Sequence, residues 1–135
     1  MENKVIVTLA ITTSLIFGSC FNKVIPANNQ NQQEILATLN HVHQIDLTNK
    51  NNILIDVRTS DEYAEGHLPQ SINIDVKNSN FENQIQKLDP KKNYYIYCRS
   101  GIRAKLATEK MQEQGLKKVY NFQDGISTYT GKIEK

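Results

Sequence analysis

The chain has few cysteines, no excess of charge of one sign, and no long apolar run. Its two cysteines, Cys20 and Cys98, are far apart and too few for a disulfide framework or a structural zinc site. The 16 Lys and Arg residues nearly balance the 14 Asp and Glu residues and are scattered among them, so composition gives no sign of nucleic-acid binding. A length of 135 residues suits one domain with one core, which we expect to be a monomer.

The longest apolar segment runs from Val5 to Phe17, directly after Lys4. Spanning a bilayer takes about twenty apolar residues, and this run is shorter and includes Thr and Ser, so it predicts an export signal. With Gly18, Ser19 and Cys20 behind it, the segment resembles a bacterial lipobox, whose cysteine is diacylated and becomes the new N-terminus. We therefore expect a signal peptide over 1–19 and lipidation at Cys20. Ordinary signal-peptide cleavage, with Cys20 a small apolar residue of the signal helix, is the alternative.

Lipidation of Cys20 would anchor the protein at a membrane of the cell envelope, facing the periplasm or the exterior. Each buried methylene contributes about 0.8 kcal/mol, so two or three acyl chains hold a protein where one does not. Residues 20–33 are rich in Asn and Gln, include Pro26 and show no apolar period, which predicts a flexible tether. The globular domain is then expected over 34–135.

Strand and helix patterns alternate along the rest of the chain. Apolar runs rich in β-branched or aromatic residues predict strands, and apolar residues at helical spacing predict helices. Strands are expected at 53–57, 71–74, 94–97 and 118–122, and helices at about 34–43, after Ser60, at 80–88, from Ile102 up to Gly115, and after Asp124-Gly125. Such alternation predicts a parallel α/β sheet.

The segment from Cys98 to Arg103 lies where a predicted strand passes into a helix, at the carboxyl edge of the sheet, where open α/β folds place ligands. Backbone amides of such a loop converge and carry partial positive charge, which suits an anion. Together with Arg99 and Arg103, this field favours the thiolate of Cys98, a candidate nucleophile, and Gly101 lets the backbone fold in closely. The alternative is a buried, inert cysteine that ends a strand.

Three blocks of the sequence carry a further signal. They are Ile55-Asp56-Val57-Arg58 through Asp61-Glu62-Tyr63 to Glu65-Gly66-His67-Leu68-Pro69-Gln70-Ser71-Ile72-Asn73-Ile74; Cys98 to Arg103; and Val119-Tyr120-Asn121-Phe122 with Asp124-Gly125-Ile126. In this order they resemble the rhodanese homology domain over about 52–130. The second block is similar to the Cys-Arg-Ser-Gly-x-Arg form of single-domain members, and in the third Asp124 stands where the family usually has one of a glycine pair. The resemblance implies a rhodanese-like three-layer α/β fold with a small, mostly parallel central sheet flanked by helices.

The resemblance implies a sulfurtransferase in which Cys98 takes a sulfane sulfur from a small anion such as thiosulfate, holds it as a persulfide and passes it to a thiol or cyanide-like acceptor. The two arginines of the loop would hold the donor, and the loop amides would bind the persulfide sulfur and the leaving sulfite. No metal or organic cofactor is implied. The substrate-binding residues are then Arg99, Ser100, Gly101, Ile102 and Arg103.

Two other activities are compatible with parts of this pattern. Phosphatases with a similar cysteine and arginine loop have five residues between the two, whereas Cys98 and Arg103 are separated by four, and a smaller ring of amides suits sulfur better. A catalytically idle module that binds a partner protein or senses sulfide is the second alternative. The intact Cys98 with both arginines favours the enzyme.

Other polar residues are interpreted as structural. Asp56 and Arg58, at the end of a buried strand, are expected to form an ion pair, and His67 is expected to fix its turn by hydrogen bonding to the backbone. His41 and His43 are two residues apart on a predicted helix and face different directions, so no metal site is expected there.

Overall fold

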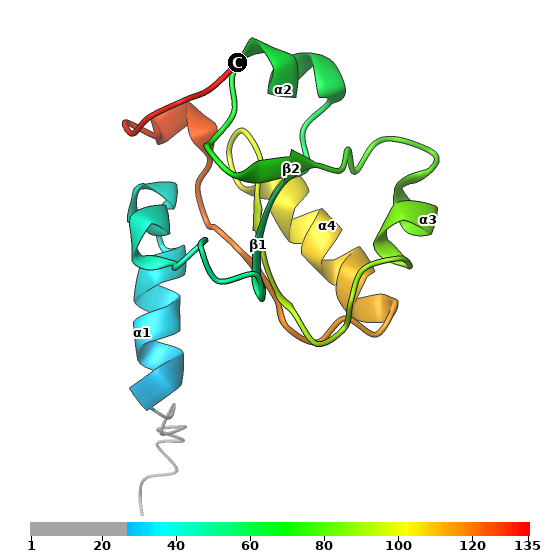
Figure 1. Cartoon of the computed structure of the whole chain (residues 1–135), viewed down its shortest axis with the longest axis horizontal. Helices are drawn as coiled ribbons and strands as arrows, with labels where there is room; N and C mark the ends of the chain where they lie inside the picture. The colour runs from blue at the N-terminus through cyan, green and yellow to red at the C-terminus, as the bar shows by residue number, and fades with distance from the viewer. Residues whose placement is uncertain (1–26) are drawn as a thin grey trace, which may run out of the picture.

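The computed structural model describes residues 27–135 (Figure 1). The predicted signal peptide, Cys20 and the predicted tether up to residue 26 lie outside the described residues. Across residues 27–135, none of the helices combines the length and the apolar character that crossing a membrane requires.

A four-stranded sheet forms the centre of the domain, and every neighbouring pair of strands is parallel. Parallel strands need crossover connections, and each of the three connections contains a helix. The spatial order is β2-β1-β3-β4, which confirms the predicted parallel α/β sheet. The strands are β1 (Asn52–Asp56), β2 (Ser71–Asn73), β3 (Asn93–Tyr97) and β4 (Val119–Asn121), and the crossover helices are α2 (Ser60–Glu65), α3 (Phe81–Ile85) and α4 (Ile102–Glu113).

Both faces of the sheet are covered, which gives three layers. Alternate residues of a strand face opposite sides. Ile55 and Ile96 pack on the side of α3 and α4, whereas Leu54 and Tyr97 pack against the 3-10 helix η1 (Leu39–Gln44) on the other side. Figure 1 shows α1 and η1 on one side of the sheet and α4 on the other. The apolar central strands are therefore buried on both faces, as their sequences predict.

The N-terminal helical region differs from the prediction. Instead of one helix at 34–43 there are two, α1 (Ala27–Leu36) and η1, because Thr38 has an extended backbone and its side chain accepts a hydrogen bond from the amide of Asn40 at 3.3 Å. Since α1 begins at Ala27, residues 27–33 of the predicted tether are helical. Gln is a good helix former, and Ile35 and Leu36 later in α1 pack against the core.

Asp124 ties η1 to the C-terminal part of the domain. One of its carboxylate oxygens accepts a hydrogen bond from the amide of Leu39 at 2.6 Å. The other accepts from the hydroxyls of Thr38 at 2.7 Å and Thr128 at 3.0 Å. The residue that departs from the rhodanese pattern thus has a structural role, which is to join segments 85 residues apart in sequence.

Candidate active site

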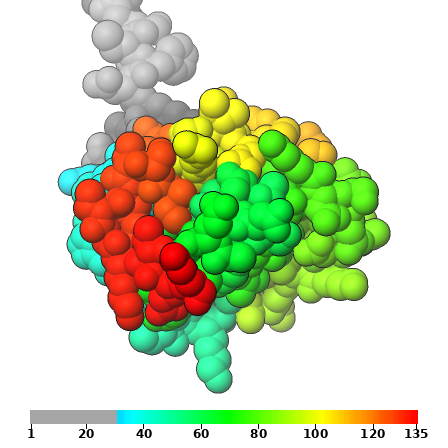
Figure 2. Space-filling view, turned by 90° about the horizontal axis from the view of Figure 1, so that it is seen from above, coloured from blue at the N-terminus to red at the C-terminus, as the bar shows by residue number. Residues whose placement is uncertain are grey.

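The loops that follow β1, β2 and β3 meet at the carboxyl edge of the sheet. Parallel strands all end at the same edge, so residues far apart in sequence come together there. Figure 2 shows this side, with the start of α4 (yellow) next to the α2 region (green). The three loops enclose a hollow of about 550 Å³, lined by Thr59, Glu62, Lys77, Arg99, Ser100, Ile102 and Arg103.

Cys98 follows β3 directly and is nearly buried, with a relative exposure of 1%. It is a free cysteine, and its Sγ accepts a hydrogen bond from the amide of Gly101 at 3.1 Å. That amide belongs to the loop entering α4, so the partial positive charge of the helix start lies next to the sulfur. The loop therefore directs a backbone hydrogen-bond donor at Sγ.

The residues that follow β4 fix the Cys98–Arg103 loop through hydrogen bonds to its backbone carbonyls. The amide of Ile126 donates to the carbonyl of Cys98 at 2.9 Å, and the amide and hydroxyl of Ser127 donate to the carbonyl of Arg99 at 3.1 and 2.8 Å. In a trans peptide the N–H points opposite to the C=O. Because these two carbonyls point toward η2 (Ile126–Thr128), the amides of Arg99 and Ser100 point away from it.

Two glycines allow this close packing. A Cβ at Gly125 would lie 2.4 Å from the carbonyl oxygens of both Cys98 and Arg99. Gly101 has a φ of 99°, and a Cβ there would lie 2.2 Å from the carbonyl oxygen of Gln123. A side chain at either position would displace the loop that carries the sulfur.

Arg103 is paired with a carboxylate. Its Nη1 and Nη2 donate to the two oxygens of Glu62 at 2.7 and 2.8 Å, and this hydrogen bonding lowers the pKa of Glu62 to about 2. Glu62 also accepts from the amide of Thr59 as part of a capping box, so the N-cap of α2 is Thr59, one residue before the expected Ser60. The pKa of Arg103 is raised mainly by Glu62, with a smaller contribution from the charge of Cys98.

Asp56 and Arg58 form a buried ion pair behind the site. Arg58 Nη2 lies 2.6 Å from Asp56 Oδ2, and the two residues are 6% and 0% exposed. Burial by itself lowers the pKa of Arg58, but hydrogen bonds to Asp56 and the charge of Asp56 outweigh it and raise the pKa. The same Nη2 donates to the carbonyl of Gly66 at 2.7 Å, which ties the end of α2 to β1.

His67 fixes the turn after α2. Its Nδ1 lies 2.9 Å from the carbonyl of Tyr63, and its ring stacks on that of Tyr63 with 3.7 Å between centroids. Its backbone pairs with Glu134 through two hydrogen bonds of 2.8 Å, which form an antiparallel bridge to the C-terminal segment. His67 is not among the residues that line the hollow at the carboxyl edge, and neither is Cys98, which lies buried just before Arg99.

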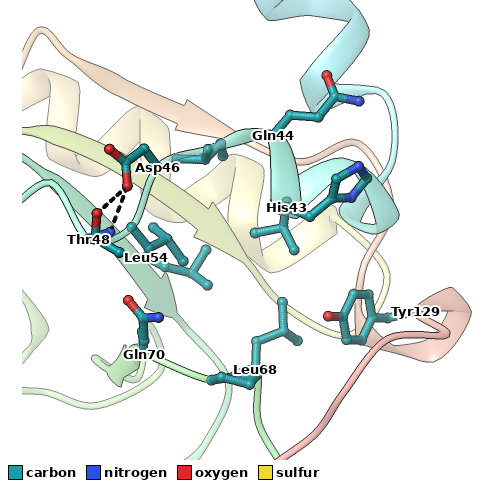
Figure 3. Close-up of a pocket in the computed structure, with 12 residues that line it drawn as sticks. His43, Gln44, Asp46, Thr48, Leu54, Leu68, Gln70 and Tyr129 are labelled. Carbon is teal, nitrogen blue, oxygen red and sulfur yellow. Dashed lines mark hydrogen bonds between the residues drawn. The ribbon is translucent and has the colours of Figure 1, made fainter.

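The remaining histidines and a second hollow lie away from Cys98. Nδ1 of His41 and of His43 each lie against a backbone carbonyl, and within 27–135 no group of three or more His, Cys, Asp or Glu residues could hold a metal ion. The second hollow, of about 520 Å³, has Leu54 and Leu68 among its apolar lining residues, with Tyr129 nearby (Figure 3). It shares no lining residue with the hollow lined by Arg99 and Arg103.

Sequence reasoning identified the loop but missed three contributors to the site. Glu62 was recognised only as part of a family block, although its position three residues after Thr59 is a capping-box signal. Lys77 belongs to none of the blocks, and no sequence signal marks it. Gly125 was recognised as part of a turn, but its contact with the backbone of Cys98 and Arg99 depends on the tertiary fold.

The sequence comparison places this geometry in a known family. The model of the rhodanese-like domain family matches residues 40–132. The chain belongs to the rhodanese-like domain family. The rhodanese blocks recognised in the sequence lie within the matched region.

Individual relatives of this rhodanese-like chain carry different names. It is 36% identical over 81 residues to the putative sulfur carrier protein YrkF of Bacillus subtilis, with 60% of this chain and 43% of that protein covered. It is 37% identical over 81 residues to the putative sulfurtransferase YtwF of the same organism, covering 60% and 76%. It is 35% identical over 95 residues to a tRNA uridine(34) hydroxylase of Buchnera aphidicola, covering 66% and 30%. The chain therefore spans less than half of two of these three proteins.

Solved structures share the fold. The BH2092 protein of Bacillus halodurans superposes with a TM-score of 0.62 at 23% identity, with 80% of this chain and 83% of that chain covered. This likeness supports the rhodanese-like α/β fold.

Proposed function

We propose that the protein is a sulfurtransferase that moves a sulfane sulfur from thiosulfate or a similar anion to a thiol or cyanide-like acceptor through a persulfide on Cys98. The observation that carries this proposal is the hydrogen bond from the amide of Gly101 to Sγ of Cys98, next to a hollow lined by Arg99 and Ser100, the two residues that follow Cys98 in the loop. A sulfur held this way is a stabilised nucleophile, and the hollow gives room for an anion.

The reaction balances without a cofactor. The thiolate of Cys98 attacks the outer sulfur of thiosulfate, an S–S bond to Cys98 forms, and the S–S bond of the donor breaks with its electron pair leaving on sulfite. In the second half, a nucleophilic acceptor attacks the outer persulfide sulfur and the thiolate of Cys98 is regenerated. The loop amides stabilise the negative charge that remains on the bound sulfur between the two steps.

Incubation with thiosulfate, followed by mass measurement of the peptide that contains Cys98, tests this proposal. We expect a gain of one sulfur atom in the full chain, loss of that sulfur when cyanide is added, and formation of thiocyanate. The Cys98→Ser variant should lose about three orders of magnitude in rate or more, as expected when a nucleophile is removed. Cys20→Ala is the matched control and should load normally.

One observation favours the idle-module alternative. Ile102, which lines the hollow, is 78% exposed, and an exposed apolar side chain at the site suits contact with a partner protein. If neither thiosulfate nor an organic persulfide loads Cys98, binding rather than turnover is the function of the site.

We also propose that Cys20 carries the lipid anchor and that the domain faces the periplasm or the exterior. The apolar run before Gly18-Ser19-Cys20 supports this proposal. Replacing Cys20 by Ala should release the protein from membranes in cell fractionation, and persistent membrane association would contradict lipidation at that residue.

A further inference from the structure

Two cations at the mouth of the hollow have no acidic partner. Lys77 and Arg99 both line it and both are exposed. Neither takes part in any of the four salt bridges among residues 27–135, which are Arg58–Asp56, Arg103–Glu62, Lys110–Glu82 and Lys132–Glu134. Glu62, the carboxylate among the lining residues, is already engaged by Arg103. The lining therefore carries two uncompensated positive charges.

The backbone that carries Lys77 is held in place next to the site. After β2 the chain continues alongside β1, with the amide of Val76 donating to the carbonyl of Val57 at 3.2 Å. The next amide, that of Lys77, donates to the carboxylate of Asp75 at 2.8 Å. Lys77 thus projects from a fixed position at the same sheet edge as Cys98, although 21 residues separate the two in sequence.

We propose that Lys77 and Arg99 form a dianion subsite for the oxyanion end of the sulfur donor, with Lys77 as the residue that sets the preference for donor charge. Arg103 is then a positioning residue, which holds the loop against α2 through Glu62. This inference rests on the proposed sulfurtransferase function and names its donor class, small anions that carry two negative charges.

The charges of the reactants explain why such a subsite is needed. A thiolate carries one negative charge and thiosulfate carries two, so the reactants repel each other as the new S–S bond forms, and three negative charges remain on the persulfide and sulfite. This repulsion is stronger at a partly buried site than in bulk water, because the effective dielectric constant is lower there. Two cations beside the donor offset part of this repulsion, whereas the charge of Arg103 is largely compensated by Glu62.

The proposal is tested by comparing sulfur donors of different charge in the wild type and in variants with a single substitution at Lys77. Lys77→Gln removes the charge and keeps most of the length of the side chain, and Lys77→Arg keeps the charge. Lys50→Gln is the matched control, because Lys50 is an exposed lysine just before β1, at the opposite edge of the sheet. Sulfur loading of Cys98 is measured with thiosulfate, a dianion, and with methanethiosulfonate, a monoanion that leaves as methanesulfinate.

For Lys77→Gln we expect kcat/KM to fall about 10-fold with thiosulfate and about 3-fold with methanethiosulfonate, since the lost attraction scales with donor charge. Lys77→Arg should restore most of the rate, and Lys50→Gln should leave both donors unchanged. Equal losses with the two donors, or no loss with thiosulfate, would overturn the proposal.

A second measurement does not depend on sulfur transfer. Alkylation of Cys98 is followed by peptide mass with iodoacetate, an anion, and iodoacetamide, which is neutral. Lys77→Gln should slow iodoacetate about 3-fold and leave iodoacetamide within about 1.5-fold, because the thiol itself is unaffected. If the wild type takes sulfur from neither donor, the proposed function is wrong. If Lys77→Gln nevertheless slows iodoacetate and not iodoacetamide, the anion subsite is still supported. Equal slowing of both reagents would show that Lys77 acts on the loop structure instead.

Discussion

Two arginine–carboxylate pairs lie at the same edge of the sheet but differ in burial and in the segments that they link. Arg58–Asp56 is almost entirely buried and links β1 to the end of α2, whereas Arg103–Glu62 lies at the rim of the hollow, with side chains 19% and 29% exposed. Both pairs have two or more hydrogen bonds between guanidinium and carboxylate. The two pairs therefore differ in solvent exposure and not in the type of hydrogen bond that joins guanidinium and carboxylate.

The comparison shows which cations are available to a ligand. A buried arginine needs its carboxylate, because an unpaired charge there would have no water to stabilise it. A rim arginine has water as an alternative partner, so its carboxylate neutralises it and fixes its direction without being essential to the fold. Both arginines are paired with a carboxylate, so Arg99 and Lys77 are the cations lining the hollow that have no carboxylate partner.

The largest effect is expected when the buried pair is broken. Asp56→Ala leaves the Arg58 charge uncompensated, so the free energy of unfolding in urea should fall by about 3–5 kcal/mol. The control Asp61→Ala removes an exposed carboxylate in the first turn of α2 and should cost about 0.5 kcal/mol. If Asp56→Ala lowered the free energy of unfolding no more than the control, burial would not explain the difference between the two pairs.

A smaller effect is expected for Glu62→Gln, which keeps a capping-box residue and removes the charge that pairs with Arg103. At pH 7 we expect a loss of about 1 kcal/mol, reduced by solvent screening. The folded-state pKa of Glu62 is depressed to about 2 from an ordinary 4.5, so this stabilisation is present above pH 4.5 and is lost as pH falls toward 2. Urea unfolding from pH 7 to pH 3 should show the variant approaching the wild type. Glu65→Gln, an exposed position on the same helix, should show no such convergence.

The smallest change in stability is expected for Arg103→Lys. An ammonium group cannot reproduce the two parallel hydrogen bonds to Glu62, but the charge is kept, so unfolding should shift by about 0.5 kcal/mol or less. The loop would lose its fixed direction, and sulfur loading of Cys98 should slow about 5-fold. A stability loss as large as that of Asp56→Ala would contradict the distinction between the rim pair and the buried pair.

The sequence was sufficient for the strands, for the parallel sheet and for the Cys98 loop, because these depend on local patterns: buried strands are apolar runs, and the loop has a family signature. It was insufficient where a residue acts on a distant one. Glu62 and Arg103 are 41 residues apart, and Asp124 and Leu39 are 85 apart, so no periodicity links them. The start of α1 at Ala27 was not predicted because Asn and Gln show no apolar period in a segment whose packing residues are Ile35 and Leu36.

The bridge between His67 and Glu134 determines where a fusion partner would be positioned. Because the last residues run alongside the turn that follows α2, a domain genetically joined after Lys135 would emerge beside that turn (Figure 2). A protein attached there through a short linker would be held at high local concentration next to the end of α2. The bridge thus sets the direction in which a fused partner leaves the domain.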